Sequence, residues 1–247
     1  MTTRGASPRP DYYPAAVRQQ TLRFGDSWAR IAPWRGGNGA AHLVVGPDAS
    51  VPPSVVHHCI ERARASGYQS VLTSAVSPSE SAVFVDAGFS VRERLHLLAV
   101  DLDEPPEPAV LPLDKATRRD RPGVLEVDDL SFDGFWRLGP VGLKDAVDAT
   151  PTTRFRVGRD DDRVIAYAIT GIAGRYGYLQ RIAVHPDVRG QGWGHALVAD
   201  GLLWVWKHGG DRVYVNTQLA NERALALYTS FGFSVIPAGL CVLARSL

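Results

Sequence analysis

Two short segments in different halves of the chain have similar sequences and the same predicted surroundings. Ala87-Gly88-Phe89-Ser90-Val91 and Phe231-Gly232-Phe233-Ser234-Val235 each follow a predicted helix and precede residues that favour strands. A helix, a strand and a second helix come before each segment in the same order. Such self-similarity is the signature of a repeated structural unit. The sequence therefore predicts two copies of one α/β unit, which limits the available folds far more than composition does.

The predicted elements of the two halves match one by one. They are helix 53–66, strand 69–74 and helix 78–87 in the first half, and helix 192–208, strand 211–216 and helix 221–230 in the second. Two short strands then close each half. Further elements upstream in the second half are helices at 117–130 and 140–148 and strands at 153–158, 163–171 and 176–184. Consecutive hairpins imply antiparallel pairing, so each unit should be an α/β (α+β) fold with a mixed, mostly antiparallel sheet flanked by helices.

The segment at 101–114 separates the halves, because its acidic residues and prolines suit neither a helix nor a central strand. We expect a flexible tail, a first unit, a linker and a second unit, at 1–14, 15–104, 105–114 and 115–247.

The composition is that of an ordinary globular protein, with 45% hydrophobic residues, 21% charged residues and a net charge of +1. This balance argues against a nucleic-acid partner. Cys59 and Cys241 are too few for a disulfide scaffold or a multi-cysteine zinc module, and the adjacent His57 and His58 have the wrong spacing for a metal site. No apolar run approaches the ~20 residues of a membrane span. We therefore expect a cytoplasmic monomer or homodimer without metal or membrane partners.

A glycine-rich loop joins the strand at 176–184 to the helix at 192–208. It contains Gly190, Gly192 and Gly194, preceded by Arg189. The first amides of a helix lack partners and carry partial positive charge, so the loop could bind a phosphate or pyrophosphate, or it could simply pack tightly. A dinucleotide-binding fold is disfavoured, since the G-x-G-x-x-G phase is absent and the next strand ends in Asn216 rather than an acidic residue.

The segment LQRIAVHPDVRGQGWG at 179–194 resembles the acetyl-coenzyme A signature of the GCN5-related N-acetyltransferase (GNAT) superfamily. In that signature an Arg or Gln is followed by two spaced glycines, here Arg189, Gly192 and Gly194. The residues that resemble the family's later motif are Asn221, Ala224, Leu227, Tyr228 and the Phe231-Gly232-Phe233 corner. The resemblance extends over about 132–247, and the internal repeat extends it to a tandem arrangement with a degenerate first copy.

The resemblance implies an acyltransferase that uses acetyl-coenzyme A as cosubstrate. One strand would splay from the next and pair with the pantetheine arm, and the pyrophosphate would lie on the amides of 189–194. The implied binding residues are Ile182, Ala183, Val184, Arg189, Gly190, Gln191, Gly192, Trp193, Gly194, Asn221 and Tyr228. Tyr228 also holds the family position whose phenol donates a proton to the departing sulfur. Alternatively, Tyr228 is a core aromatic and Asn221 only a helix cap.

In the implied reaction a primary amine attacks the thioester directly in a ternary complex. The general base is open among Glu126, Asp128, Asp129 and a water held by Gln180 or Asn216. Residues 126–132, followed by Trp136, are similar to enzymes that acetylate the N-terminal amine of proteins. The expected acceptor is a protein N-terminus or lysine. The alternatives are a small-molecule amine, as in mycothiol-synthase-like tandem members, or a module that binds acetyl-coenzyme A without turnover.

The first copy lacks the features that bind the cosubstrate. Its loop falls on 45–50, where paired glycines and an arginine are missing, and Pro47, Pro52 and Pro53 remove amide donors. Phe84 stands at the position of Tyr228 and cannot donate a proton. We therefore expect no coenzyme A in the first unit.

Overall fold

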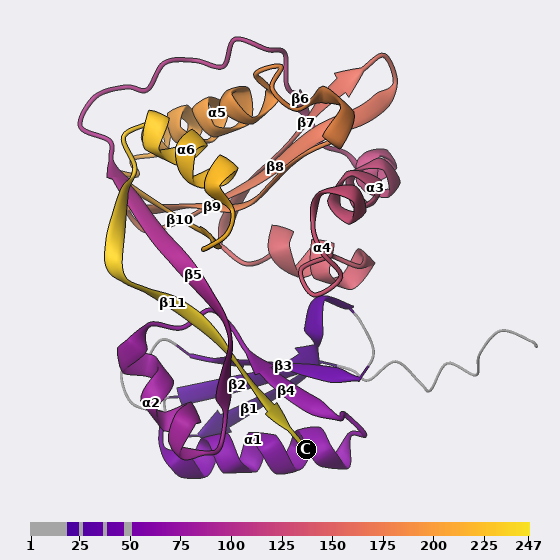
Figure 1. Ribbon diagram of the computed structural model, residues 1–247, viewed down its shortest axis with the longest axis vertical. Coiled ribbons are helices and arrows are strands. Elements are labelled where there is room, and N and C mark those ends of the chain that lie inside the picture. Colours follow the sequence, from indigo (N-terminus) through magenta and orange to yellow (C-terminus); the bar gives the residue numbers. More distant parts are fainter. Residues whose placement is uncertain (1–18, 25–26, 37–38, 47–50) are drawn as a thin grey trace, which may run out of the picture.

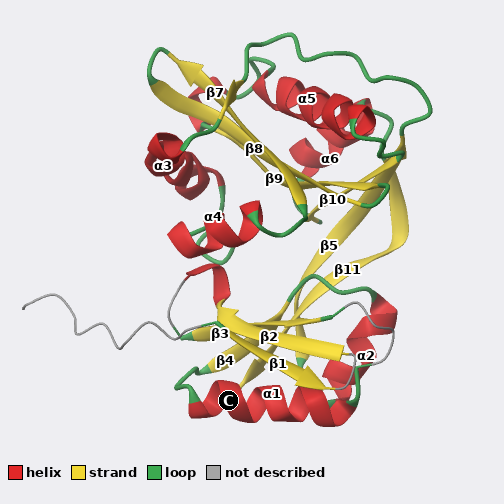
Figure 2. Cartoon of the chain, turned by 180° about the vertical axis from the view of Figure 1, so that it is seen from behind, coloured by secondary structure: helices red, strands yellow, loops and turns green. Residues whose placement is uncertain are grey.

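The computed structural model describes residues 19–24, 27–36, 39–46 and 51–247. Eleven strands form one mixed sheet in the order β1-β2-β3-β4-β11-β5-β10-β9-β8-β7-β6 (Figures 1 and 2). The predicted tail at 1–14 and most of the predicted first-unit loop at 45–50 lie outside the described residues. Within the described residues, no helix is long and apolar enough to cross a membrane.

The first half of the chain supplies one end of the sheet and two helices. Its elements are β1 (Gln20–Phe24), β2 (Ser27–Pro33), β3 (Ala40–Val45), α1 (Pro53–Ala65), β4 (Ser70–Thr73), α2 (Pro78–Asp86) and β5 (Ser90–Asp101). Both helices begin with proline at their first position, where the missing N–H costs no hydrogen bond. Ser77 adds a capping box with Glu80 at the start of α2. These local signals explain why the predicted helix starts match the structure closely.

The second half supplies the other end of the sheet and covers both of its faces. Its elements are β6 (Asp114–Lys115), α3 (Arg121–Ser131), α4 (Pro140–Val147), β7 (Thr152–Asp160), β8 (Arg163–Ala173), β9 (Tyr176–Val184), α5 (Trp193–Lys207), β10 (Arg212–Gln218), α6 (Glu222–Ser230) and β11 (Ser234–Ser246). Helices α5 and α6 lie on one side of β8, β9 and β10, and α3 and α4 lie on the other (Figure 1). The prediction of a mixed α/β sheet flanked by helices is confirmed.

Two long strands connect the ends of the sheet. Residues 95–101 of β5 pair with β10 of the second half, and residues 244–246 of β11 pair with β4 of the first half. The prediction that two short strands close each half is wrong, because β5 and β11 are each continuous. Between Ile236 and Leu240, where Pro237 and Gly239 would be expected to end a strand, β11 continues and only shifts its register against β5. Gly239 has a φ of 58° in this segment. The unit boundaries at 104 and 114, which enclose the expected linker, stay a prediction.

The buried apolar residues form separate clusters on the two faces of the sheet. In the first half, Phe84 of α2 and Ile60 of α1 pack against Leu43 and Leu243 of the sheet. In the second half, one cluster joins α5 and α6 to the sheet through residues such as Val198 and Tyr228, and another joins α3 and α4 to the opposite face. Strand β9 therefore contributes to the clusters on both faces, whereas β10 packs against α5 and α6. This packing positions the two strands whose separation is described next.

Candidate functional site

Strands β9 and β10 run parallel and separate after three residue pairs. The pairs extend from Tyr176 and Arg212 to Tyr178 and Tyr214. Beyond that point β9 continues to Val184 on β8, and β10 continues to Gln218 on β5. The two strands therefore open into a V, as the family resemblance implies.

A β-bulge in β9 lies just beyond the last pair. Ile169 of β8 faces Arg181, and Thr170 faces Leu179, so Gln180 is the extra residue. Before and after the bulge, Leu179 and Ile182 both pack on the side of α5, whereas a regular strand would point them to opposite faces. The bulge thus redirects β9 at the mouth of the V.

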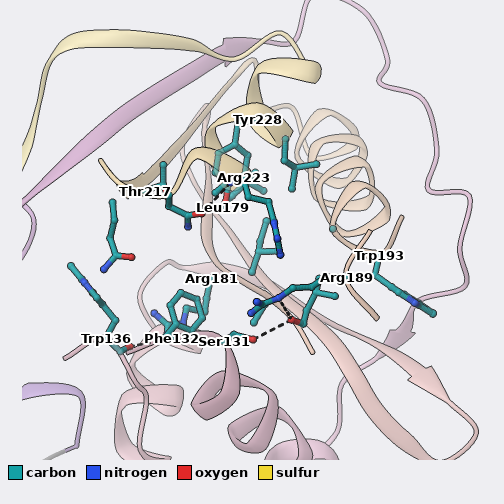
Figure 3. A pocket seen from close by; sticks show the side chains of 18 of the residues that line it. Ser131, Phe132, Trp136, Leu179, Arg181, Arg189, Trp193, Thr217, Arg223 and Tyr228 are labelled. Carbon is teal, nitrogen blue, oxygen red and sulfur yellow. Dashed lines mark hydrogen bonds between the residues drawn. The ribbon is translucent and has the colours of Figure 1, made fainter. Parts of the chain in front are cut away.

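A cavity of about 1010 Å³ occupies the opening between β9 and β10 (Figure 3). Ten of the eleven predicted cosubstrate-binding residues line it: Ile182, Ala183, Val184, Arg189, Gly190, Gly192, Trp193, Gly194, Asn221 and Tyr228. Gln191 is exposed and does not line the cavity. The fold therefore brings the glycine loop, the free end of β9 and the start of α6 to one space.

The glycine loop uses its glycines for different reasons. Gly192 caps α5 at φ 88°, and Gly190 has φ 80°, so both adopt backbone conformations that other residues rarely tolerate. A Cβ on Gly194 would lie 3.3 Å from the Leu227 side chain, which shows that Gly194 lets α5 approach α6. Arg189 is exposed, and its Nε donates to the Val184 carbonyl at 3.4 Å. The loop thus combines a helix N-terminus, close backbone approach and an available cation, which suits a pyrophosphate.

Tyr228 is buried at the inner end of the cavity. Its side chain comes from α6, 7% of its surface is exposed, and its ring packs 5.7 Å from that of Phe233. Burial raises the pKa of the Tyr228 phenol to about 12, so the hydroxyl is protonated at neutral pH and can donate. The residue is therefore both a core aromatic and a cavity-lining donor.

Asn221 caps α6, since its Oδ1 accepts a hydrogen bond from the backbone N–H of Ala224 at 3.2 Å. The same residue lines the cavity. The capping interpretation is thus confirmed, and a contact between Asn221 and pantetheine stays a prediction.

The three carboxylates considered as general bases lie away from the cavity. Asp128 is fully buried and binds Arg181 at 2.6 Å, the backbone N–H of Leu138 at 2.7 Å and the hydroxyl of Tyr167. Burial raises the pKa of Tyr167, and Asp128 adds to this effect while Arg181 opposes it. Asp128 therefore neutralises a buried arginine rather than accepting a substrate proton.

Glu126 and Asp129 occupy exposed positions on α3 and pair with Arg163 and Arg137 at 3.1 Å each. Neither lines the cavity, whereas Gln180 and Asn216 do. The Nε2 of Gln180 donates to Thr150, and its Oε1 is buried without a partner among the described residues. A water held by Gln180 or Asn216 as the proton acceptor stays a prediction.

Several lining residues were not predicted from the sequence. The first half contributes Arg35 and Leu95, and α6 contributes Arg223. Arg35 lies in a glycine-rich stretch whose pattern indicates only a turn. No local pattern indicates its contact with Trp136, about a hundred positions away. In the described ranges, no group of three metal-ligating side chains is present.

Comparisons with known proteins point to one family for the second half of the chain. The model of the acetyltransferase (GNAT) family matches residues 122–233, which include β9, the glycine loop and α6. This region of the chain is therefore similar to the GNAT acetyltransferases. Enzymes of this family use acetyl-coenzyme A as cosubstrate. The residues that line the cavity between β9 and β10, called the GNAT site below, fit that molecule, because Gly190 and Gly192 have no side chains to cover their amides and Arg189 lies beside them.

Relatives of known activity match this chain over different shares of its length. Mycothiol acetyltransferases of Stackebrandtia nassauensis and Acidimicrobium ferrooxidans are 28% and 27% identical, over 57% and 78% of this chain. The [ribosomal protein bS18]-alanine N-acetyltransferase of Escherichia coli K12 is 35% identical over 29% of this chain. The matched regions span 50%, 70% and 49% of these relatives.

The solved structure of a tandem GNAT protein from the clavulanic acid biosynthesis pathway is similar over 91% of this chain and 81% of that one. Its TM-score is 0.64 at 16% sequence identity, so the likeness concerns the fold. The tandem GNAT fold expected from the sequence repeat is confirmed.

Proposed function

We propose that the GNAT site transfers the acetyl group of acetyl-coenzyme A to a primary amine by direct attack in a ternary complex. The observation that carries this proposal is the single cavity that joins the glycine loop to Tyr228 through the opening between β9 and β10. A phosphate cradle at one end and a protonated phenol deep inside match the two ends of a thioester cosubstrate.

The free edge of β9 supports binding of the pantetheine arm. The N–H of His185 donates to the carbonyl of Ile165 in β8 at 2.8 Å. Because successive amides of a strand alternate in direction, the amides of Val184 and Ile182 face the opposite edge, toward the V. Pantetheine amides can pair there as an added strand does. The Val184 carbonyl accepts hydrogen bonds from Ser131 at 3.2 Å and from Arg189 at 3.4 Å. Its N–H has the direction needed to donate to the thioester oxygen.

Three groups of this chain assist the reaction: one stabilises negative charge, one donates a proton and one holds the water that accepts a proton. Acetyl-coenzyme A supplies the acetyl group as a thioester. The N–H of Val184 stabilises the negative charge that develops on the carbonyl oxygen, and the Tyr228 hydroxyl donates its proton to the departing sulfur. A water bound to the Oε1 of Gln180 receives the proton from the attacking amine. No covalent bond to the enzyme is needed.

The acceptor we favour is a small-molecule primary amine. Both halves of the chain line the cavity, since Arg35 and Leu95 come from the first half. The mycothiol acetyltransferase that matches 78% of this chain also includes both halves in the match. A protein N-terminal amine is the second candidate, because the similarity to the bS18-alanine N-acetyltransferase reaches 35% identity over 72 residues.

Two assays test the proposal together. Calorimetry should detect acetyl-coenzyme A binding, and a thiol-release assay should detect turnover with at least one member of a panel of small amines and N-terminal peptides. Binding without thiol release for any acceptor would leave a non-catalytic acetyl-coenzyme A module. Absence of binding would remove the proposed function altogether.

A further inference from the structure

Arg35 of the first half lies between aromatic rings from both halves. Its guanidinium is 4.9 Å from the ring centroid of Trp34 and 4.8 Å from that of Trp136. Trp136 follows α3 in the second half, and both Arg35 and Trp136 line the cavity of the GNAT site. Aromatic faces attract a cation without neutralising its charge. The rings therefore hold the guanidinium in place and leave its positive charge available.

Contacts from the second half also fix the backbone of Arg35. Its φ of 49° is in the left-handed region, which is uncommon for a residue other than glycine. Its carbonyl accepts a hydrogen bond from the N–H of Gly139 at 2.9 Å, and a Cβ on Gly142 of α4 would lie only 2.7 Å from the same oxygen. Contacts from the second half thus hold the segment that carries Arg35 in an unfavourable conformation, as is common at functional sites.

No described carboxylate forms an ion pair with Arg35, although Asp128 acts on its charge from a longer distance. Its Nε is buried and has no hydrogen-bond partner among the described residues. Arg181, which lines the same cavity, differs because Asp128 binds it at 2.6 Å. Burial, together with the like charge of Arg181, lowers the pKa of Arg35 to about 9, so the guanidinium is still charged at neutral pH. Arg35 is half-buried, and a partly desolvated cation without an ion-pair partner is costly unless a ligand supplies the opposite charge.

The position of Arg35 distinguishes it from the cations at the phosphate end. In Figure 3, its stacking partner Trp136 lies across the cavity from Arg189 and Trp193 of the glycine-loop region. Among the described lining residues, the only carboxylate is that of Glu222, at the start of α6. The end of the cavity near Trp136 therefore has a positive charge that neither the protein nor the pyrophosphate offsets.

We propose that the acceptor is an amine that also carries a carboxylate, as an amino acid does, and that Arg35 binds this carboxylate. The planar guanidinium can donate two parallel hydrogen bonds to the two carboxylate oxygens. Arg35 then acts as a specificity-determining residue supplied by the half that lacks its own cosubstrate loop. This inference rests on the proposed acetyltransferase function and narrows its substrate class.

The test compares acceptors with and without a carboxylate. Thiol release is measured for amino acids and for the corresponding primary amides. Within each pair, kcat/KM is compared per concentration of unprotonated amine, because the amide has the less basic amine. The wild-type protein should prefer the carboxylate by about 10- to 100-fold, the size expected for a hydrogen-bonded charge pair. In Arg35→Gln this preference should fall to near unity, mainly through KM, while Arg35→Lys should keep part of it.

Arg92→Gln is the matched control. Arg92 also lies over an aromatic ring, that of Phe135 at 5.0 Å, but it lines a neighbouring cavity of about 520 Å³ and not the larger one. This variant should keep the wild-type preference for the carboxylate. Acetyl-coenzyme A affinity, measured by calorimetry, should be unchanged in all three variants, which shows that each is folded.

The outcomes separate the inference from the proposed function. Equal use of acids and amides by the wild-type protein overturns the inference and leaves the acetyltransferase function in place, whatever the variants do. An equal loss with both acceptors in Arg35→Gln assigns Arg35 a packing role and also overturns it. Absence of turnover with any amine overturns the proposed function itself.

Discussion

Tyr178 of β9 and Tyr214 of β10 form the last parallel pair before the two strands separate, and their rings stack with centroids 6.0 Å apart. The pair marks the closed end of the V. Beyond it, the bulge at Gln180 turns β9 away, and the cavity opens between the strands. The site therefore depends on one local irregularity in an otherwise regular sheet.

Replacing Tyr228 with Phe should lower kcat by about 100-fold or more and leave acetyl-coenzyme A affinity nearly unchanged. The phenol is expected to donate its proton only to the departing sulfur, so its loss should affect turnover and not binding. Steady-state kinetics and calorimetry measure the two quantities. Tyr178→Phe is the control, because Tyr178 does not line the cavity. Unchanged kcat in Tyr228→Phe would remove the phenol from the mechanism.

The pH profile should show no loss of activity from ionisation of Tyr228 below pH 10. Burial raises the pKa of Tyr228 to about 12, above the ordinary value of 10, so the donor stays protonated while the acceptor amine loses its proton. The rate should therefore rise through the alkaline range. A fall in kcat with an apparent pKa below 10 that disappears in Tyr228→Phe would contradict this assignment.

Gly192→Asp should weaken acetyl-coenzyme A binding by about 100-fold or more, through like-charge repulsion at the phosphate cradle and through crowding of the α5 N-terminus. Gly174→Asp provides a control, since Gly174 also has a positive φ, 59°, and lies in the turn between β8 and β9. Calorimetric titration measures both. If Gly192→Asp keeps wild-type affinity while remaining folded, the loop does not bind the pyrophosphate.

Asp128→Ala should destabilise the protein by about 3–5 kcal/mol, because it leaves the buried Arg181 without its counter-ion. Asp129→Ala, one residue along α3, removes an exposed pair with Arg137 and should cost no more than about 1 kcal/mol. Urea unfolding followed by circular dichroism compares the two. Similar midpoints for both variants would show that the Asp128 network contributes little to stability.

One acetyl-coenzyme A molecule should bind per chain. In the first half, β3 and β4 pair along the whole of β4, from Ala40 and Ser70 to Leu43 and Thr73, so no V opens between them. The corresponding helix α1 begins after Pro52 with Pro53, which removes amide donors. Calorimetry should therefore give a stoichiometry near one in the wild-type protein and no detectable binding in Gly192→Asp. A second site would show that the first half retains the function.

The parts of this structure that could be predicted from the sequence are those governed by local signals. Prolines, glycines and capping residues place the helix ends within a few positions, and the glycine loop with Tyr228 locates the cavity between β9 and β10. The buried role of Asp128 also had a signal, because Val124, Val127 and Asp128 share one face of α3 at helical spacing. That spacing separates Asp128 from the exposed Glu126 and Asp129.

The features that could not be predicted depend on contacts between distant segments. Nothing in the sequence of β5 or β11 indicates that each strand continues into the sheet of the other half, since strand partners are set by tertiary packing. The same holds for Arg35, whose role arises only when Trp136 is brought beside it. The proposed acceptor end of the cavity therefore depends on contacts between the two halves.

The most direct measurement is a crystal structure of the protein with bound coenzyme A. The account predicts that the pyrophosphate contacts the amides of residues 189–194, that the pantetheine arm lies along β9, and that the sulfur lies within hydrogen-bond distance of the Tyr228 hydroxyl. A ligand bound elsewhere, or a sulfur remote from Tyr228, would contradict it.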